Sequence, residues 1–156
     1  MNRHVRPIRL ARDRYVGRHS YFVTTCCHNN EILLSDLTCA RLIIGELVVA
    51  AAKHSFSLPP YCAMPNHLHL LATASSRDAN LLKFISYFKQ KTAYRYRREH
   101  GQRLWQPRYF EYILRKAENF ESVAVYIWNN PVRAEICARA IDYQFSGSTT
   151  IDWKKR

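Results

Sequence analysis

Residues 58–73 read LPPYCAMPNHLHLLAT, and the other predicted elements are arranged around this stretch. Two mainly apolar runs, at 58–63 and 67–73, flank a Met-Pro-Asn segment, and proline followed by asparagine favours a turn. The stretch therefore predicts a β-hairpin. In its second strand, the two-residue period places His67 and His69 on one face, so two imidazoles can converge on one ion while Leu68 anchors the core.

Patterns on either side of the hairpin predict the other elements. Aromatic and β-branched runs indicate strands, and apolar residues at helical spacing indicate helices. Gly101 is expected to stop the second helix and Pro131 the third. The order β-α-β-β-α-β-α favours an α+β fold, a ferredoxin-like antiparallel sheet with packed helices. The expected elements are strands at 21–27, 58–63, 67–73 and 108–114, and helices at 36–54, 78–98 and 118–130.

Length and composition favour one folded, soluble domain. The chain has 156 residues, of which 47% are hydrophobic and 23% charged. The longest apolar stretch, at 42–52, is broken by Gly45 and Glu46, so no span of a bilayer is expected. Five cysteines without a CxxC pair, and a start without the apolar block of a secretory signal, favour the reducing cytoplasm. The expected organisation is a basic arm at 1–20, a single domain at 21–145 and a tail at 146–156.

The positive charge is concentrated in two segments. The net charge of +12 comes from 24 basic and 12 acidic residues; residues 1–20 contribute +5 and residues 83–108 contribute +7, so the rest of the chain is neutral. Two cationic surfaces on a neutral domain indicate a polyanionic partner, with nucleic acid the leading candidate. Aromatic residues lie between the cations of the second segment, which suits a single strand. A solvated helix face and a membrane-surface helix are the alternatives.

The histidine pair is competent to bind a metal, but the spacing alone is not specific. Metallohydrolases with such a pair commonly continue with Asp-His, whereas Leu70 and Leu71 follow here, which weakens a zinc-hydrolase interpretation. Cys62 could complete a soft zinc site with the two histidines. Strand geometry instead favours Cys62 as a core residue.

A second candidate motif lies at 126–132, which read YIWNNPV. Tyr126 and Asn130 are four residues apart, so they share one face of the last predicted helix, where a phenol and an amide can act together. The alternative is that Tyr126 is a half-buried packing residue and Asn130 caps the helix before proline.

Taken in order, these motifs resemble one family. YFVTTC, MPNHLHLL, the basic helix, LWQPRYFEYIL and YIWNNPVRAEI cover roughly residues 21–136. They are similar to the transposases associated with repetitive extragenic palindromes (REP-associated tyrosine transposases), relatives of the single-tyrosine HUH transposases of insertion sequences. The resemblance implies that His67 and His69 are the paired metal ligands on a central strand, that Tyr126 is the nucleophile, and that Asn130 completes the metal site.

The resemblance also implies an activity. The protein would be a metal-dependent endonuclease and strand transferase that cuts single-stranded DNA beside REP hairpins through a 5′-phosphotyrosine intermediate. Two imidazoles and one amide suit Mn²⁺ well and Mg²⁺ acceptably. The expected partner is single-stranded DNA with a REP hairpin and not a membrane, and a monomer is favoured over a dimer. The expected DNA-binding residues are Arg9, Arg12, Arg14, Lys89, Lys91, Arg95, Arg97, Arg98 and Arg108.

Other interpretations remain open from the sequence. Tyr96, with His100 four residues later, is a rival nucleophile, although it lies in the segment assigned to DNA contact. A non-catalytic module for single-stranded nucleic acid would also suit a ferredoxin-like sheet with exposed aromatic residues. A zinc hydrolase is the third function class. The remaining rival tyrosines are Tyr94, Tyr109 and Tyr112.

Overall fold

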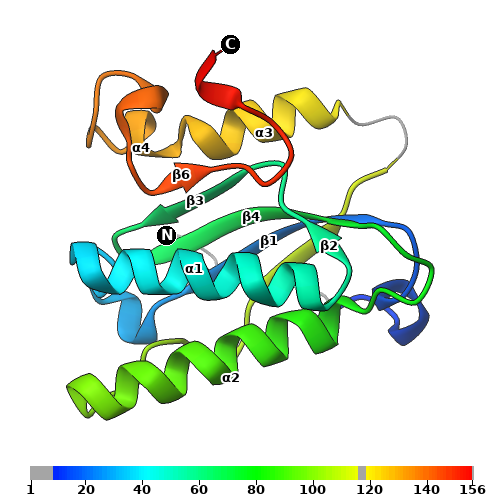
Figure 1. The fold of residues 1–156 in the computed structure, drawn as a ribbon, viewed down its shortest axis with the longest axis horizontal. Coiled ribbons are helices and arrows are strands. Elements are labelled where there is room, and N and C mark those ends of the chain that lie inside the picture. Colours follow the sequence, from blue (N-terminus) through cyan, green and yellow to red (C-terminus); the bar gives the residue numbers. More distant parts are fainter. Residues whose placement is uncertain (1–8, 116–118, 156) are drawn as a thin grey trace, which may run out of the picture.

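The computed structural model describes residues 9–115 and 119–155, which form an antiparallel sheet with helices (Figure 1). The strands are β1 (Ser20–Cys26), β2 (Phe56–Ser57), β3 (Tyr61–Met64), β4 (His67–Ala74), β5 (Phe110–Ile113) and β6 (Ser146–Gly147). The helices are α1 (Leu37–Lys53), α2 (Leu81–His100), α3 (Phe120–Trp128) and α4 (Asn130–Arg133). Short 3-10 turns lie at Arg12–Tyr15, His28–Asn30, Ala140–Asp142 and Trp153–Lys155.

The sheet has the strand order β5-β1-β4-β3-β6, and β2 pairs with the end of β4. Every named pair is antiparallel, and β1 and β4 are central. The units β1-α1-β3 and β4-α2-β5 interleave in this order, because β4 lies between β1 and β3 and β1 lies between β4 and β5, which is the ferredoxin-like arrangement. The predicted α+β fold is therefore confirmed.

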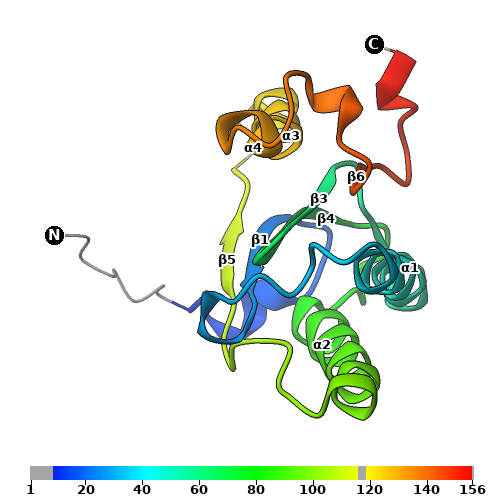
Figure 2. The ribbon, with the colours of Figure 1, turned by 90° about the vertical axis from the view of Figure 1, so that its left-hand side faces the viewer.

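The two faces of the sheet have different environments. Along β1, buried and half-buried side chains alternate, as expected for a strand with one face in a core. Tyr21 and Val23 of the buried set join Leu68, Leu70 and Phe84 in the main core. Figure 2 shows α1 and α2 on one side of the sheet, where they cover this core, while α3 and α4 lie beside β3. The face of β4 that carries the two histidines thus points away from α1 and α2.

Local signals explain where the two long helices begin and end. The Asp36 side chain caps α1 by accepting a hydrogen bond from the Cys39 backbone N–H at 2.9 Å. At the start of α2, Asn80 accepts from the Lys83 N–H at 3.1 Å, so the helix begins after Asn80 and not at the expected residue 78. Gly101, with a left-handed φ of 70°, ends α2 as predicted.

The predicted helix at 118–130 differs from the structure at its end. Its expected start, residue 118, lies outside the described residues. In the described part, α3 ends at Trp128, and after Asn129 the chain enters the short helix α4. Pro131 therefore does not stop helical structure but lies in the first turn of α4. A backbone N–H at this position would have no intrahelical acceptor, so its absence in proline costs no hydrogen bond.

Two predicted strands are shorter in the structure. The segment expected to be a strand from residue 58 begins pairing only at Tyr61, because Pro59 and Pro60 have no N–H to donate to a ladder. The segment expected at 108–114 pairs over Phe110–Ile113.

The described residues near both ends pack against the domain. Tyr15 is buried and its hydroxyl donates to the Glu111 carboxylate in β5. At the other end, β6 pairs with β3, and the Trp153 ring stacks on Trp128 of α3 with centroids 4.8 Å apart. The expected boundaries at 20/21 and 145/146 therefore fall inside packed structure, and residues 1–8 of the expected arm lie outside the described residues. No helix in the described ranges is long and apolar enough to cross a membrane.

Candidate active site

His67 and His69 converge on the half-buried face of β4. Their Nε2 atoms lie 3.0 Å apart, and the two rings meet nearly at right angles. In the register of the sheet, Cys26 of β1 stands opposite His67 and Thr24 stands opposite His69. The sheet therefore brings the two imidazoles together on its open face, as the strand period predicted.

The neighbours of the imidazoles select which nitrogen carries the proton. The Nδ1 atom of His67 lies 2.7 Å from Asn66 Oδ1, an oxygen that can only accept. The Nδ1 atom of His69 lies 2.7 Å from Thr24 Oγ1, a hydroxyl that can donate or accept. In the tautomer with both Nδ1 atoms protonated, the two Nε2 lone pairs face one another, and a cation between them would stabilise this arrangement. The pair thus fits a metal ion.

Burial keeps both histidines neutral. It lowers the pKa of His67 below its ordinary value of 6.5. For His69, burial together with the neighbouring His67 and Arg133 lowers the pKa to about 3. A neutral imidazole is the form that ligates a metal. The two side chains are therefore in the ligand form at neutral pH.

Asn130 supplies the third polar group. It is the first residue of α4, and its Nδ2 lies 3.3 Å from His67 Nε2. A rotation of the amide by 180° exchanges Nδ2 with Oδ1, so the carbonyl oxygen can face the same point. Within 9–115 and 119–155, no cluster of three or more His, Cys, Asp or Glu residues could hold a metal. A donor set of two imidazoles and one amide fits Mn²⁺, and Mg²⁺ less closely.

Cys62 does not complete a site with the histidines. It stands opposite His69 in the β3–β4 register but is fully buried. Burial raises the pKa of its thiol to about 11, so the thiol stays protonated and is a poor metal ligand. This agrees with its expected place in the core.

Tyr126 lies across the same face of the sheet. Its side chain is 52% exposed. The ring centroid is 6.2 Å from that of Phe22, which in turn is 5.5 Å from the His69 ring. A shallow groove of about 370 Å³ lies beside Tyr126, lined also by Phe22, Tyr112, Ser122 and Val123. The tyrosine is therefore accessible to a ligand that also reaches the histidine face.

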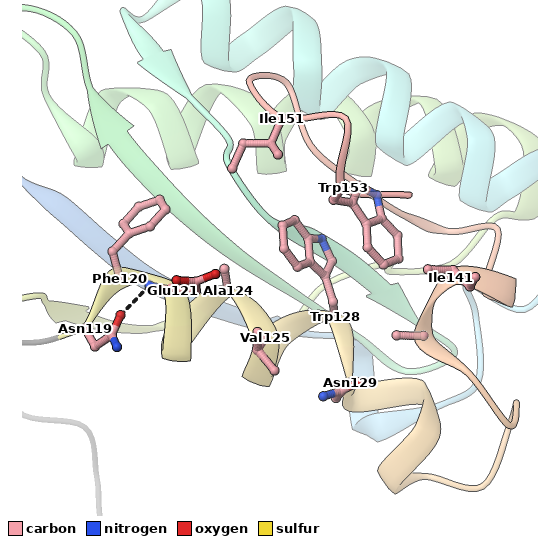
Figure 3. A pocket seen from close by; sticks show the side chains of 11 residues that line it. Asn119, Phe120, Glu121, Ala124, Val125, Trp128, Asn129, Ile141, Ile151 and Trp153 are labelled. Carbon is pink, nitrogen blue, oxygen red and sulfur yellow. Dashed lines mark hydrogen bonds between the residues drawn. The ribbon is translucent and has the colours of Figure 1, made fainter. Parts of the chain in front are cut away.

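The opposite side of α3 holds the helix in place. Ile127 is buried in the main core, and Trp128 Nε1 donates to the Gly147 carbonyl at 3.0 Å. Figure 3 shows Trp128 pointing towards Trp153 and Ile151, in a mainly apolar pocket of about 520 Å³. That pocket lies behind α3 and does not include the histidine pair.

Arg133 belongs to the site, although the sequence patterns did not single it out. Its guanidinium carbon lies 3.9 Å from the centroid of the Tyr126 ring. No carboxylate of the described residues pairs with it, and its charge is one cause of the low pKa of His69. Spacing along the sequence does not reveal this contact, because Tyr126 lies on α3 and Arg133 on α4.

The rival tyrosines have different surroundings. Tyr96 is only 4% exposed, and its ring stacks on His100. The hydroxyl of Tyr109 is buried, and burial raises its pKa. Tyr94 is exposed but lies on α2, which packs on the other face of the sheet. Tyr112 lies on β5 opposite Phe22 and lines the same groove as Tyr126, so it is the one rival on the histidine side of the sheet.

The expected DNA-binding residues fall into two groups. Lys89 is partly buried, donates to the Gln106 carbonyl at 2.7 Å, and has a pKa lowered to about 8 by burial. Lys91 and Arg95 pair with Glu46 of α1 at 3.3 and 2.7 Å. These three cations are engaged within the protein. The exposed cations without a carboxylate partner among the described residues are Arg9, Arg12, Arg14, Arg97, Arg98 and Arg108.

Comparison with known proteins identifies the family. The model of the family described as "Transposase IS200 like" matches residues 15–130, which is most of the chain. The chain therefore belongs to the IS200-like transposases, the family that its motifs resembled. It is 22% identical to the REP-associated tyrosine transposase of Escherichia coli over 147 residues, which cover 89% of this chain and 87% of that protein.

Two further comparisons cover a similar share of the chain. An uncharacterized protein of Haemophilus influenzae is 24% identical over 160 residues, covering 83% of this chain and 89% of that protein. Among solved structures, a REP-associated tyrosine transposase bound to a REP hairpin superposes with a TM-score of 0.73 at 20% identity, over 89% of this chain and 82% of that one. At this level of identity the superposition supports the fold.

Proposed function

We propose that this protein cuts and rejoins single-stranded DNA beside a REP-type hairpin, with Tyr126 as the nucleophile. Family membership supports a DNA-cleaving transposase, and the structural relative was solved with a REP hairpin. The observation that carries the proposal is the convergence of His67, His69 and Asn130 on the open sheet face, with Tyr126 and Arg133 beside them.

The covalent step needs no reactant other than the DNA strand and Tyr126. The Tyr126 hydroxyl oxygen bonds to the scissile phosphorus, and the bond from phosphorus to the 3′-oxygen breaks. The tyrosine loses its proton and the 3′-oxygen gains one, which leaves a 5′-phosphotyrosine and a free 3′-hydroxyl. One phosphodiester replaces another, so a 3′-hydroxyl can reverse the step, and the same site can both cut and join.

The residues around Tyr126 have separate tasks. Arg133 covers the tyrosine ring and has free N–H donors for a phosphate oxygen. Asn66 and Thr24 contact the Nδ1 atoms of His67 and His69 at 2.7 Å and so orient both rings. A divalent cation bound by His67, His69 and Asn130 would supply positive charge beside the scissile phosphate.

The test uses hairpin oligonucleotides from the genomic neighbourhood, labelled at either end, with Mn²⁺ or Mg²⁺. We expect a covalent adduct with the fragment on the 3′ side of the cut, visible on denaturing gels. EDTA and Tyr126→Phe should abolish it. Tyr94→Phe, a matched loss of an exposed tyrosine hydroxyl outside the site, should leave it intact.

The rival functions give different results. A non-catalytic single-strand binding module would bind the hairpin tightly but form no adduct, with or without metal. A zinc hydrolase would contain tightly bound zinc and release products without a covalent protein–DNA species. An adduct that persists in Tyr126→Phe would place the nucleophile elsewhere and overturn the proposal.

A further inference from the structure

A second groove lies at the C-terminal half of α2, apart from the histidine site. It encloses about 550 Å³ between α2 and the segment 103–107 that leads towards β5. Tyr94 and Arg97 line it from α2, and Arg103 and Pro107 from the segment. Leu104 and Trp105 are buried and, with Ala93, Gln90, Gln106 and Lys89, complete the lining.

The groove is preformed by hydrogen bonds across it. Gly101 ends α2 and lets the chain turn back along the helix. Trp105 Nε1 then donates to Thr92 Oγ1 at 2.8 Å, and Lys89 Nζ donates to the Gln106 carbonyl at 2.7 Å. The segment is thus fixed to α2 at two points, which lowers the conformational cost of binding a ligand between them.

The lining combines an exposed ring with unpaired cations. Tyr94 is 64% exposed; the Arg98 guanidinium lies 5.8 Å from the centroid of its ring, so a base would stack on the opposite face. Neither Arg97 nor Arg103 has an ion-pair partner in the described part of the chain, whereas Lys91 and Arg95 of the same helix share Glu46. None of the lining residues is acidic. An aromatic platform beside free guanidinium groups suits a base and its phosphate.

The segment 103–107 also connects the groove to the end of β1, which pairs with β4 at His67. The Gln106 N–H donates to the Cys26 carbonyl at 2.9 Å, and Trp105 bridges to Cys27. On its other side, Cys26 stands opposite His67. Gln106 and His67 are therefore separated by two strand spacings, about 10 Å. A short single strand can reach from one to the other.

We propose that this groove binds one unpaired nucleotide of the single-stranded DNA that flanks the hairpin. The base stacks on Tyr94, and Arg97 and Arg103 contact the adjacent phosphate. The inference rests on the proposed function in taking single-stranded DNA as the substrate. It adds a binding subsite that holds the flank while the scissile phosphate lies at Tyr126.

The test measures binding in EDTA, where no cleavage interferes. The probes are a fluorescent hairpin with a single-stranded flank and the same hairpin without it. Tyr94→Ala should weaken binding of the flanked hairpin by about 5- to 100-fold, the range for loss of one stacked base, and Tyr94→Phe should not. Binding of the hairpin without a flank should stay within twofold.

A charge variant gives an independent readout. Arg97→Gln should reduce the slope of log affinity against log salt by about 0.7 for the flanked hairpin, as expected for one lost contact to a single-strand phosphate. Arg77→Gln is the matched control, because Arg77 is exposed and precedes the other end of α2. The salt dependence of binding by the Arg77→Gln variant should equal that of the parent protein.

These outcomes test nucleotide binding in the groove independently of the proposed catalytic function. Unchanged affinity in Tyr94→Ala, or an equal loss for both probes, overturns the groove as a flank site whether or not the parent forms an adduct. Selective loss for the flanked probe supports the groove even if the parent forms no adduct, in which case the proposed function fails alone. Thermal melting of each variant confirms that the loss is not caused by unfolding.

Discussion

Arg133 places a positive charge at the proposed nucleophile and has no carboxylate partner among the described residues. A guanidinium stacked over a tyrosine ring is attracted to its face and restricts the ring's orientation. Its planar donors also match phosphate oxygens in a way that a lysine ammonium does not. The residue therefore serves both to orient Tyr126 and to meet the charge that develops on the phosphate.

Replacing Arg133 with glutamine should slow adduct formation by about 100-fold, the effect of removing one positioned donor from a developing oxyanion. Affinity for the hairpin in EDTA should change far less, and Arg133→Lys should recover only part of the rate. Millimolar guanidinium ion should restore activity to Arg133→Ala. The control is Arg139→Gln, which removes an exposed arginine that pairs with Asp142. If Arg133→Gln lowered the affinity for the hairpin and the rate of adduct formation by the same factor, Arg133 would contact DNA without acting on the reacting phosphate.

The neutral histidines make stability depend on pH. The pKa of His69 is about 3 in the folded state against 6.5 as its ordinary value, so in the interval between these values the unfolded chain binds more protons. Stability is full above about pH 6.5 and falls as the pH drops below it. We expect the metal-free protein to lose about 1 kcal/mol more than His69→Gln between pH 7.5 and 5.5, measured by urea unfolding. Equal losses would mean that His69 titrates normally.

The helix that carries Tyr126 depends on the C-terminal segment for its packing. α3 has only nine residues, too few to be stable alone, and its outer side is covered by the stacked pair Trp128 and Trp153. The break at Asn129 then starts α4 and brings Asn130 to the histidines. The positions of Tyr126 and Asn130 thus follow from how these two short elements are anchored.

Removing this anchor should loosen α3 before the rest of the fold. Trp153→Ala should lower the free energy of unfolding by about 2–4 kcal/mol and speed amide hydrogen exchange in α3 more than in α1. Trp153→Phe retains a stacked ring and should stay closer to the parent. Unchanged exchange in α3 would show that the main core holds this helix by itself.

The candidate site is complete within one chain. Asn130 approaches His67, and Tyr126 contacts Phe22, without any second copy. We therefore expect a monomer to be competent, in line with the preference drawn from the family resemblance.

Mixing two inactive variants tests this. Tyr126→Phe and His67→Ala together should form no adduct, because neither chain contains both groups, and light scattering should show a single-chain mass. Recovery of up to a quarter of the activity per chain would indicate exchange of α3 between copies.

Much of this architecture was predictable because it depends on local periodicity. The two-residue period placed His67 and His69 on one face, the turn residues gave the hairpin, and Gly101 ended α2 at the expected place. Other details depend on neighbours distant in sequence. From the sequence we expected Lys89 to contact DNA. In the structure the segment after α2 turns back along the helix, and two of its backbone carbonyls accept hydrogen bonds from the Lys89 ammonium group.

The sequence alone determined the fold class, the shared face of the histidines and the order of the family's motifs, because strand period, helix period and turn chemistry act over a few residues. Only the tertiary structure shows that Arg133 covers Tyr126, that Pro131 opens α4, and that Tyr94 lines a groove on the other face of the sheet from the histidines. These relations join separate elements, and packing between elements is set by the complementarity of whole surfaces, which no local pattern encodes.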